Sequence, residues 1–140
     1  MSKAGRVNKI TTGGEPMRYD QNPYQNQHQS YYQNIDAFAA QRLISGGYSG
    51  RNDQRFCRIL DVREPEEFER GHLPGAVNVP LHQVGRKVPY LMPNRSIPLL
   101  VCCGSGARSL PAVQVLSVMG YTNLYNLQKG IETWPYRLER

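Results

Sequence analysis

The sequence predicts an α/β fold with a mostly parallel central sheet and helices on both of its faces. Short apolar runs typical of buried strands alternate with helical segments of about ten residues. The most apolar run, 96–103, is followed directly by a loop of small residues and a further helical segment. Sites in such sheets lie beyond the carboxyl ends of the strands, which is where this loop begins. The length of 140 residues suits one domain with its own core.

The first half of the chain is expected to contain two strands and two helices. They are an edge strand over 31–34, a helix over 37–44, a strand over 56–62 and a short helix over 63–72. Asp36 is placed to cap the first helix, and Phe38 lies at helical spacing from later apolar residues. Pro65 lies in the first turn of the second helix and Gly71 at its end.

The second half continues the same alternation. It is expected to hold a turn and short strand in 73–81, a weak helix over 82–91, the central strand over 96–103, a helix over 108–120, a strand over 122–128 and a terminal helix or turn over 130–138. Pro89 is expected to interrupt the weak helix. The residues expected to face inward from the helix over 108–120 are Leu110, Val113, Leu116 and either Val118 or Met119. Gly120 follows the end of that helix.

The N-terminal segment has a different composition from the rest. From Tyr19 to Asn34, twelve of sixteen residues are Tyr, Gln or Asn. Such a polar tract buries too little apolar area to offset its ordering entropy, so residues 1–30 are predicted to be a disordered tail before a domain over 31–140. The alternative is a tyrosine-bearing segment that binds a protein partner.

Composition narrows the class of protein. The net charge is +6, but the basic residues are scattered, which favours a solvated basic surface and gives no expectation of nucleic-acid binding. The three cysteines, Cys57, Cys102 and Cys103, fit neither a disulfide framework nor zinc-ligand spacing, so we expect no metal. No apolar segment is long enough to span a membrane. The expected location is the cytoplasm, with the mitochondrion as the alternative, and the expected state is a monomer.

The loop from Cys103 to Arg108 joins a buried strand to a helix N-terminus. Its two glycines allow successive amide N–H groups to point into one concavity, and the helix dipole adds positive potential there. This environment stabilises a thiolate relative to the thiol, and it also suits an anionic substrate. The loop therefore predicts a nucleophilic cysteine that meets an anionic or electrophilic partner. The alternative is a plain structural turn with two buried cysteines.

The motifs around this loop resemble those of single-domain rhodaneses. The stretch from Asp61 to Pro80 matches the family pattern D-V-R-x-x-x-E-[FY]-x-x-G-H-[IL]-P-G-A-x-N-[IVL]-P. The positions that match its C-x-x-G-x-R-S loop are Cys103, Gly106, Arg108 and Ser109. The positions that match its later motifs are Gly120, Tyr121, Asn126, Leu127, Gly130 and Trp134. The resemblance covers about residues 31–137.

The resemblance implies a sulfurtransferase. In the family a cysteine thiolate takes a sulfane sulfur from a small anionic donor such as thiosulfate, or from a persulfide. The resulting cysteine persulfide then passes the sulfur to a thiol or to cyanide. By alignment Cys103 is the nucleophile, and the residues that bind substrate are Gly104, Ser105, Gly106, Ala107, Arg108 and Ser109. No metal or organic cofactor is implied; the covalent intermediate is the persulfide on Cys103.

Three positions depart from the family pattern. Gly104 stands where many thiosulfate-using members have a basic residue, which weakens the case for thiosulfate as the donor. Lys129 replaces the first glycine of a pair, a change expected to shift a turn outside the loop. Cys102 stands where the family often has tyrosine or another strand residue.

Cys102 also opens a rival interpretation. Cys102 and Arg108 have the C-x5-R spacing of cysteine phosphatases, some of which share the rhodanese fold. Because alternate strand residues face opposite sides, Cys102 is expected to point into the core if Cys103 points into the loop. A resolving thiol is a further role for Cys102. The rival of another class is a non-enzymatic rhodanese module, which the intact cysteine argues against.

Three more residues are expected to support the site. Asp61 and Arg63 follow a strand at the site-bearing end of the sheet, and they are expected to form an ion pair that ties the loops together. His72 is expected to hydrogen-bond backbone and fix a turn, with general-base catalysis as the alternative. The acids of the segment 64–69 are interpreted as a solvated helix face.

Overall fold

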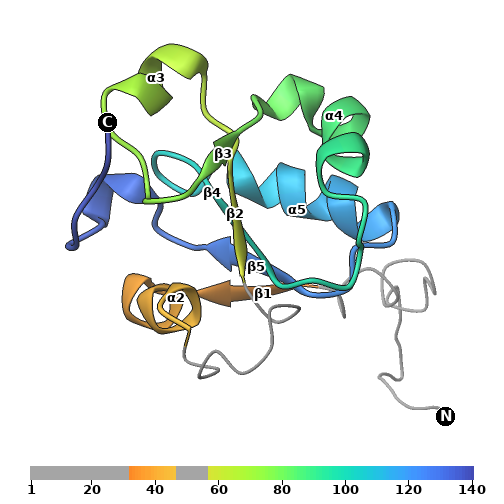
Figure 1. Cartoon of the computed structure of the whole chain (residues 1–140), viewed down its shortest axis with the longest axis horizontal. Helices are drawn as coiled ribbons and strands as arrows, with labels where there is room; N and C mark the ends of the chain where they lie inside the picture. The colour runs from red at the N-terminus through yellow and green to blue at the C-terminus, as the bar shows by residue number, and fades with distance from the viewer. Residues whose placement is uncertain (1–31, 47–56) are drawn as a thin grey trace, which may run out of the picture. The chain divides into compact units, whose positions relative to one another are not determined.

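Five parallel strands form one sheet in the computed structural model of the chain, which describes residues 32–46 and 57–140. The strands are β1 (Tyr32–Ile35), β2 (Arg58–Asp61), β3 (Val77–Asn78), β4 (Leu99–Cys102) and β5 (Leu124–Leu127). Their order across the sheet is β1-β5-β4-β2-β3, with β4 in the centre (Figure 1). The predicted parallel sheet, the edge position of β1 and the central position of β4 are confirmed.

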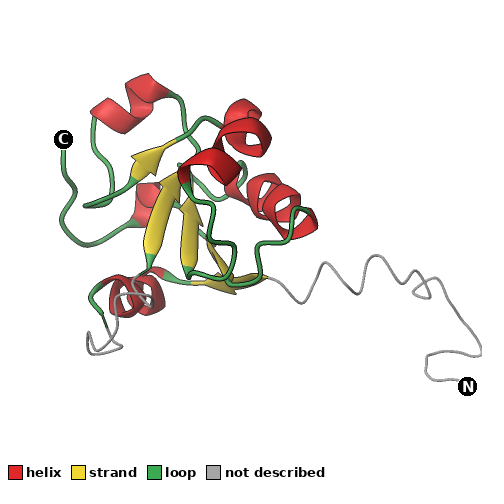
Figure 2. Ribbon diagram, turned by 45° about the vertical axis from the view of Figure 1, so that its right-hand side comes forward, coloured by secondary structure: helices red, strands yellow, loops and turns green. Residues whose placement is uncertain are grey.

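Helices cover both faces of this sheet. The helices are α2 (Ala37–Ile44), α3 (Pro65–Glu69), α4 (Val84–Leu91) and α5 (Ser109–Val118), with single turns of 3₁₀-helix at η3 (Leu81–Gln83) and η4 (Ile131–Thr133). Buried residues of α4 and α5 pack on one face, and those of α2 and η4 pack on the other. Figure 2 shows α4 and α5 together on one side of the strands, with α2 on the opposite side.

The central strand β4 alternates strictly between the two cores. Leu99, Val101 and Cys103 pack with the α4–α5 side, and Leu100 and Cys102 pack with the α2 side. All five side chains are fully buried. This alternation follows from the two-residue period of a strand, and it gives the neighbouring cysteines opposite environments.

Local sequence signals explain the helix starts. The Asp36 carboxylate accepts a hydrogen bond from the Ala39 amide at 2.9 Å, so the predicted cap of α2 is confirmed. In α3, Pro65 occupies the first turn, as predicted. Glu64 and Glu67 form a capping box there, and the Glu64 amide donates to Glu67 Oε1 at 2.9 Å.

Two expectations about the helices were wrong. Pro89 lies inside α4 and does not interrupt it, because it is in the last turn and the Met92 amide still reaches the Val88 carbonyl at 2.7 Å. In α5, Leu110 is 37% exposed, so its expected inward orientation is wrong. Val113 and Leu116 are buried as expected, and of the pair Val118 and Met119 it is Met119 that packs against the core. Ser109, which packs beneath the cysteine loop, takes the inward position expected for Leu110. The residues of α5 that are buried are Ser109, Ala112, Val113, Leu116 and Ser117.

The inward face of α2 also differs from the expectation. Phe38 is 64% exposed, and the fully buried residue of the helix is Ala40. The predicted tail over 1–30 and the first residue of the predicted strand, Phe56, lie outside the described residues. Within the described ranges, no helix is both long and apolar enough to cross a membrane.

A substitution at Tyr121 tests how the end of α4 is anchored to the core. Its side chain is 1% exposed, and its hydroxyl donates to the Met92 carbonyl at the end of α4 at 2.6 Å. Tyr121→Phe removes this buried hydrogen bond and should lower stability by about 1 kcal/mol. For a domain of this size that loss should lower Tm by about 4–8 °C, which thermal unfolding measures.

Tyr90→Phe is the matched control, because Tyr90 is 85% exposed. Its Tm should stay within about 2 °C of the parent value. Equal melting temperatures for the two variants would show that the Tyr121 hydroxyl does not anchor α4.

Candidate active site

The strand register brings the ends of β2 and β4 together. Asp61 is the partner of Cys102 across the two parallel strands. Both strands therefore stop at the same edge of the sheet, and the residues that follow them, from Arg63 and from Cys103, are neighbours. The loop after Cys103 then enters α5 at Ser109. The expected site-bearing edge is thus built from two strand ends and one helix N-terminus.

Three backbone amides point at the Cys103 sulfur. The N–H groups of Gly106, Arg108 and Ser109 donate to Sγ at 3.1, 3.2 and 3.3 Å. Ser109 Oγ also lies 3.6 Å from Sγ and donates to the Gly106 carbonyl at 3.3 Å. Three backbone N–H donors therefore surround the sulfur, and such donors can stabilise negative charge that develops there.

Other amides of the loop are free to bind a further group. Among the residues that the structure describes, the N–H groups of Gly104, Ser105 and Ala107 make no hydrogen bond. Ser105 and Ala107 are exposed, whereas Gly104 is buried. A loop with unpaired amides above a cysteine is equipped to receive an anionic atom bonded to the sulfur or close to it.

Two glycines allow the loop to lie against the turn after β5. Gly106 has φ +101°, and a Cβ there would stand 2.1 Å from the Gln128 carbonyl oxygen. Gly130 has φ +73°, and a Cβ there would stand 2.2 Å from the Gly104 carbonyl oxygen. Gly130, the second position of the pair whose first glycine is replaced by Lys129, directly contacts the loop.

Hydrogen bonds reinforce this contact. The Ile131 amide donates to the Cys103 carbonyl at 2.8 Å, and the Glu132 amide donates to the Gly104 carbonyl at 2.9 Å. The start of η4 therefore fixes the carbonyls at the beginning of the loop. The amides of the loop are left to face the sulfur and the solvent.

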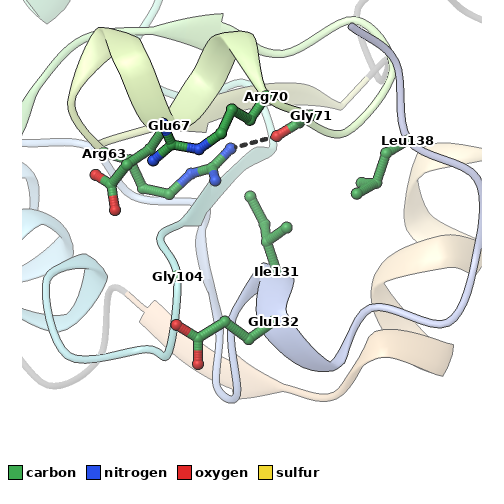
Figure 3. A pocket seen from close by; sticks show the side chains of 8 residues that line it. All are labelled: Arg63, Glu67, Arg70, Gly71, Gly104, Ile131, Glu132 and Leu138. Atoms are coloured by element: carbon green, nitrogen blue, oxygen red, sulfur yellow. Dashed lines mark hydrogen bonds between the residues drawn. The ribbon is translucent and has the colours of Figure 1, made fainter.

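A pocket of about 310 Å³ opens beside the loop (Figure 3). Its lining residues are Arg63, Glu67, Arg70, Gly71, Gly104, Ile131, Glu132 and Leu138. Gly104 is the loop residue at its wall, directly after Cys103, whose own side chain is fully buried. The pocket carries two arginines and two glutamates, so its lining has no net charge.

Arg108 braces the loop against α3. Its guanidinium donates to both oxygens of Glu67, with Nη1–Oε1 at 2.7 Å and Nη2–Oε2 at 3.0 Å. The hydrogen bond from Arg108 lowers the pKa of Glu67 to about 2, and the same pair raises the pKa of Arg108. The sequence offered two roles for Arg108, a cation for the substrate or a brace. In this structure the Arg108 guanidinium forms an ion pair with the Glu67 carboxylate, which is the bracing role.

Asp61 and Arg63 form a buried ion pair. Arg63 Nη2 lies 2.8 Å from Asp61 Oδ2, and the same nitrogen donates to the Gly71 carbonyl at 2.7 Å. Burial disfavours the Arg63 charge, but the hydrogen bond and the charge of Asp61 outweigh it, so the pKa of Arg63 is raised. The pair therefore joins the end of β2 to the turn after α3, as expected for a structural role.

His72 also holds backbone. Its Nδ1 lies 2.8 Å from the Phe68 carbonyl, and its ring stacks on Phe68 with centroids 3.7 Å apart. The His72 and Glu139 main chains exchange two hydrogen bonds, at 2.9 and 2.8 Å. These contacts fix the turn and tie down the C-terminal segment. They leave His72 outside the lining of the pocket and separate from Cys103.

The two other cysteines, Cys57 and Cys102, belong to the core on the α2 side of the sheet. Burial raises the pKa of Cys57 to about 12 and that of Cys102 well above its ordinary value. Cys102 faces the α2 side of the sheet, and the loop amides converge on Cys103. With Arg108 engaged by Glu67, neither part of the C-x5-R phosphatase arrangement is assembled around Cys102.

Three charged residues of the pocket lining, Glu67, Arg70 and Glu132, were not predicted from the sequence as site residues. Glu67 was read as part of a solvated helix face, although its position three residues after Glu64 is a capping-box signal. Arg70 and Glu132 carry no local signal, because only the tertiary fold brings α3 and η4 to one pocket. Within the described residues, no group of three His, Cys, Asp or Glu side chains could hold a metal.

The fold and the site together define an α/β domain with a parallel sheet and an amide-cradled cysteine, Cys103, directly after its central strand. The family described as "Rhodanese-like domain" matches residues 37–135, and the chain therefore belongs to the rhodanese-like domain family. The resemblance drawn from the sequence motifs is confirmed.

Relatives with modest identity share this domain. The chain is 35% identical over 109 residues to the uncharacterized protein YqhL of Bacillus subtilis. The aligned region covers 78% of this chain and 80% of YqhL. It is 37% identical over 67 residues to the thiosulfate sulfurtransferase PspE of Escherichia coli, which covers 48% of this chain and 64% of PspE. A rhodanese-related protein from Thermoplasma volcanium has a similar structure, with TM-score 0.63, 27% identity and coverage of 77% of this chain and 98% of that chain.

Gly106→Ala tests the contact between the loop and the turn after β5. The added Cβ would meet a backbone carbonyl at 2.1 Å, and alanine would be strained at φ +101°. The variant should lose about 2–4 kcal/mol of unfolding free energy in urea. Gly75→Ala is the control, because Gly75 has φ +82° with open space around it and should lose only about 1–2 kcal/mol. Equal losses would mean that close approach to Gln128 does not constrain the loop.

Glu67→Gln tests the brace through its pH dependence. The folded pKa of Glu67 is about 2 and the ordinary value is 4.5, so its contribution is complete above pH 4.5 and disappears as pH falls toward 2. The two side chains are 38% and 31% exposed, so the difference at neutral pH should be about 1 kcal/mol or less. Urea unfolding between pH 6 and pH 2.5 should show the wild type and the variant converging as pH falls.

Glu66→Gln, which changes an exposed acid on the same helix, serves as the control. Its offset from the wild type should vary little over this range. A Glu67→Gln offset that stayed constant down to pH 2.5 would contradict the ion-pair assignment.

Proposed function

We propose that this protein is a sulfurtransferase that moves a sulfane sulfur from a small donor to a thiol or cyanide through a persulfide on Cys103. The observation that supports this most directly is the convergence of three amides on the Cys103 sulfur at a helix N-terminus. Relatives named as sulfurtransferases support the same reaction class.

The first step is a displacement at sulfur. The Cys103 thiolate attacks the outer sulfur of the donor, a new S–S bond forms, and the donor's own bond to that sulfur breaks. With thiosulfate the leaving group is sulfite; with a hydropersulfide it is a thiol that keeps the proton. The product is a Cys103 persulfide anion, and no external oxidant or reductant is consumed.

The loop stabilises the negative charge throughout this step. The amides of Gly106, Arg108 and Ser109 hold the charge on Sγ before attack. The free amides of Gly104, Ser105 and Ala107 would then hold the outer sulfur of the persulfide. Because the donors are part of the backbone and the loop is fixed by η4, little reorganisation is needed.

The second step returns the enzyme to its starting state. An acceptor thiolate or cyanide attacks the outer sulfur, the Cys103 S–S bond breaks, and the Cys103 thiolate is restored. Arg108, Asp61 and Arg63 act in this proposal as positioning residues, because their charges are engaged by one another or by Glu67.

Intact-protein mass spectrometry with peptide mapping tests the proposal. Brief exposure to thiosulfate or to cysteine persulfide should add one sulfur to Cys103, and cyanide should remove it as thiocyanate. Cys103→Ser should lower turnover by at least about 10³-fold, because the nucleophile is gone.

Cys102→Ser is the matched control, since it changes the neighbouring cysteine that faces the other core. It should keep most of the activity. Turnover by Cys103→Ser at a rate close to the wild type, or an added sulfur that maps to Cys102, would overturn the proposal.

A further inference from the structure

Two charged side chains in the pocket have no ion-pair partner, whereas the other two are paired. Arg63 pairs with Asp61, and Glu67 pairs with Arg108. Arg70 and Glu132 also line the pocket, and among the described residues neither charged group takes part in an ion pair or hydrogen bond. Both residues are exposed, so their charges are available to a ligand.

The two charges lie on opposite walls. Arg70 follows α3 at its C-terminal end, and Glu132 is in η4. Figure 3 shows Glu132 below the pocket beside Gly104, Arg70 above it, and the apolar side chain of Ile131 between them. The pocket thus presents a cation and a carboxylate across an apolar floor.

The Glu132 carboxylate lies beside the cysteine loop, next to the guanidinium of Arg108. Glu132 Oε2 is 3.2 Å from the position that a Cβ on Gly104 would take. The Glu132 amide is also hydrogen-bonded to the Gly104 carbonyl, which keeps this residue next to the loop. A donor that enters along Gly104 therefore meets the unpaired Glu132 carboxylate beside the Arg108 guanidinium, which is already paired with Glu67.

This arrangement suits a donor that carries charges of both signs. Thiosulfate is a dianion with no cationic group, so it has nothing to pair with the Glu132 carboxylate. A donor with an ammonium group turns the same carboxylate into an attractive contact. If it also has a carboxylate, Arg70 can bind that group on the other wall.

We infer that the preferred sulfur donor is a persulfide of an α-amino acid or short peptide, with its ammonium group at Glu132 and its carboxylate at Arg70. This inference rests on the proposed function and specifies its substrate class. The step is the displacement already described: the Cys103 thiolate takes the outer sulfur, and the amino-acid thiol leaves with the proton. Both charges of the donor stay paired while the S–S bond is exchanged.

The test compares donors that differ by one charged group. The rate of Cys103 persulfide formation is measured by mass spectrometry with cysteine persulfide, with 3-mercaptopropionate persulfide, which lacks the ammonium group, with cysteamine persulfide, which lacks the carboxylate, and with thiosulfate. The rate at which sulfur is added to the Cys103→Ser variant, which measures addition elsewhere on the protein, is subtracted from each rate.

The variants remove one charge at a time. Glu132→Gln should reduce the preference for cysteine persulfide over 3-mercaptopropionate persulfide by about 3–10-fold and raise the rate with thiosulfate by a similar factor. Arg70→Gln should reduce the preference for cysteine persulfide over cysteamine persulfide by about 3–10-fold. Both effects should shrink as salt rises from 50 to about 500 mM. Glu66→Gln, outside the pocket lining, should leave all four rates unchanged.

The outcomes separate the two proposals. If Cys103 gains sulfur but Glu132→Gln and Arg70→Gln leave the donor preferences unchanged, the substrate assignment is wrong and the sulfurtransferase proposal stands. If no donor adds sulfur to Cys103 faster than to the Cys103→Ser control, the proposed function itself fails.

Discussion

The hydrogen bonds from three loop amides to the Cys103 sulfur are the interaction on which the rest of the site depends. They require the chain to turn sharply after β4 and to start α5 at Ser109, which is buried beneath the loop in place of Leu110. They also require support from behind, because a loop that directs its amides inward must have its carbonyls satisfied elsewhere. The start of η4 supplies two of those partners.

Around the loop, the paired charges hold the structure together, and the unpaired charges remain available to a ligand. The Asp61–Arg63 pair ties β2 to the turn at Gly71, and the Glu67–Arg108 pair ties α3 to the loop. These pairs hold the pocket wall in place, and they leave its remaining charges for a ligand. A family motif that contains several charged residues can therefore be mostly architectural, and in our proposal the donor is recognised by Arg70, at a position that the motif leaves unspecified, and by Glu132, outside the motif.

Much of this fold could be predicted from the chain because its signals are local. The Asp36 cap, the apolar run at 96–103 and the glycine-containing loop each specify their own element, and parallel strands place the loop at the carboxyl edge. The inward face of α5 could not be predicted in the same way, since Ser109 is drawn under the loop by a contact with Cys103 and not by hydrophobicity. Glu132 was missed because η4 reaches Gly104 only after β5 has paired with β4.

The close approach of Gly106 and Gly130 to neighbouring backbone determines when the cysteine loop can fold during synthesis. Cys103 and its amides occur before residue 110, but the backbone that supports them comes from Gln128 and from the residues after Gly130. A nascent chain that has left the ribosome only as far as α5 carries the thiol without the turn that shapes its loop. The loop around Cys103 therefore takes its final shape only after β5 and the residues that follow Gly130 have been synthesised and have joined the sheet.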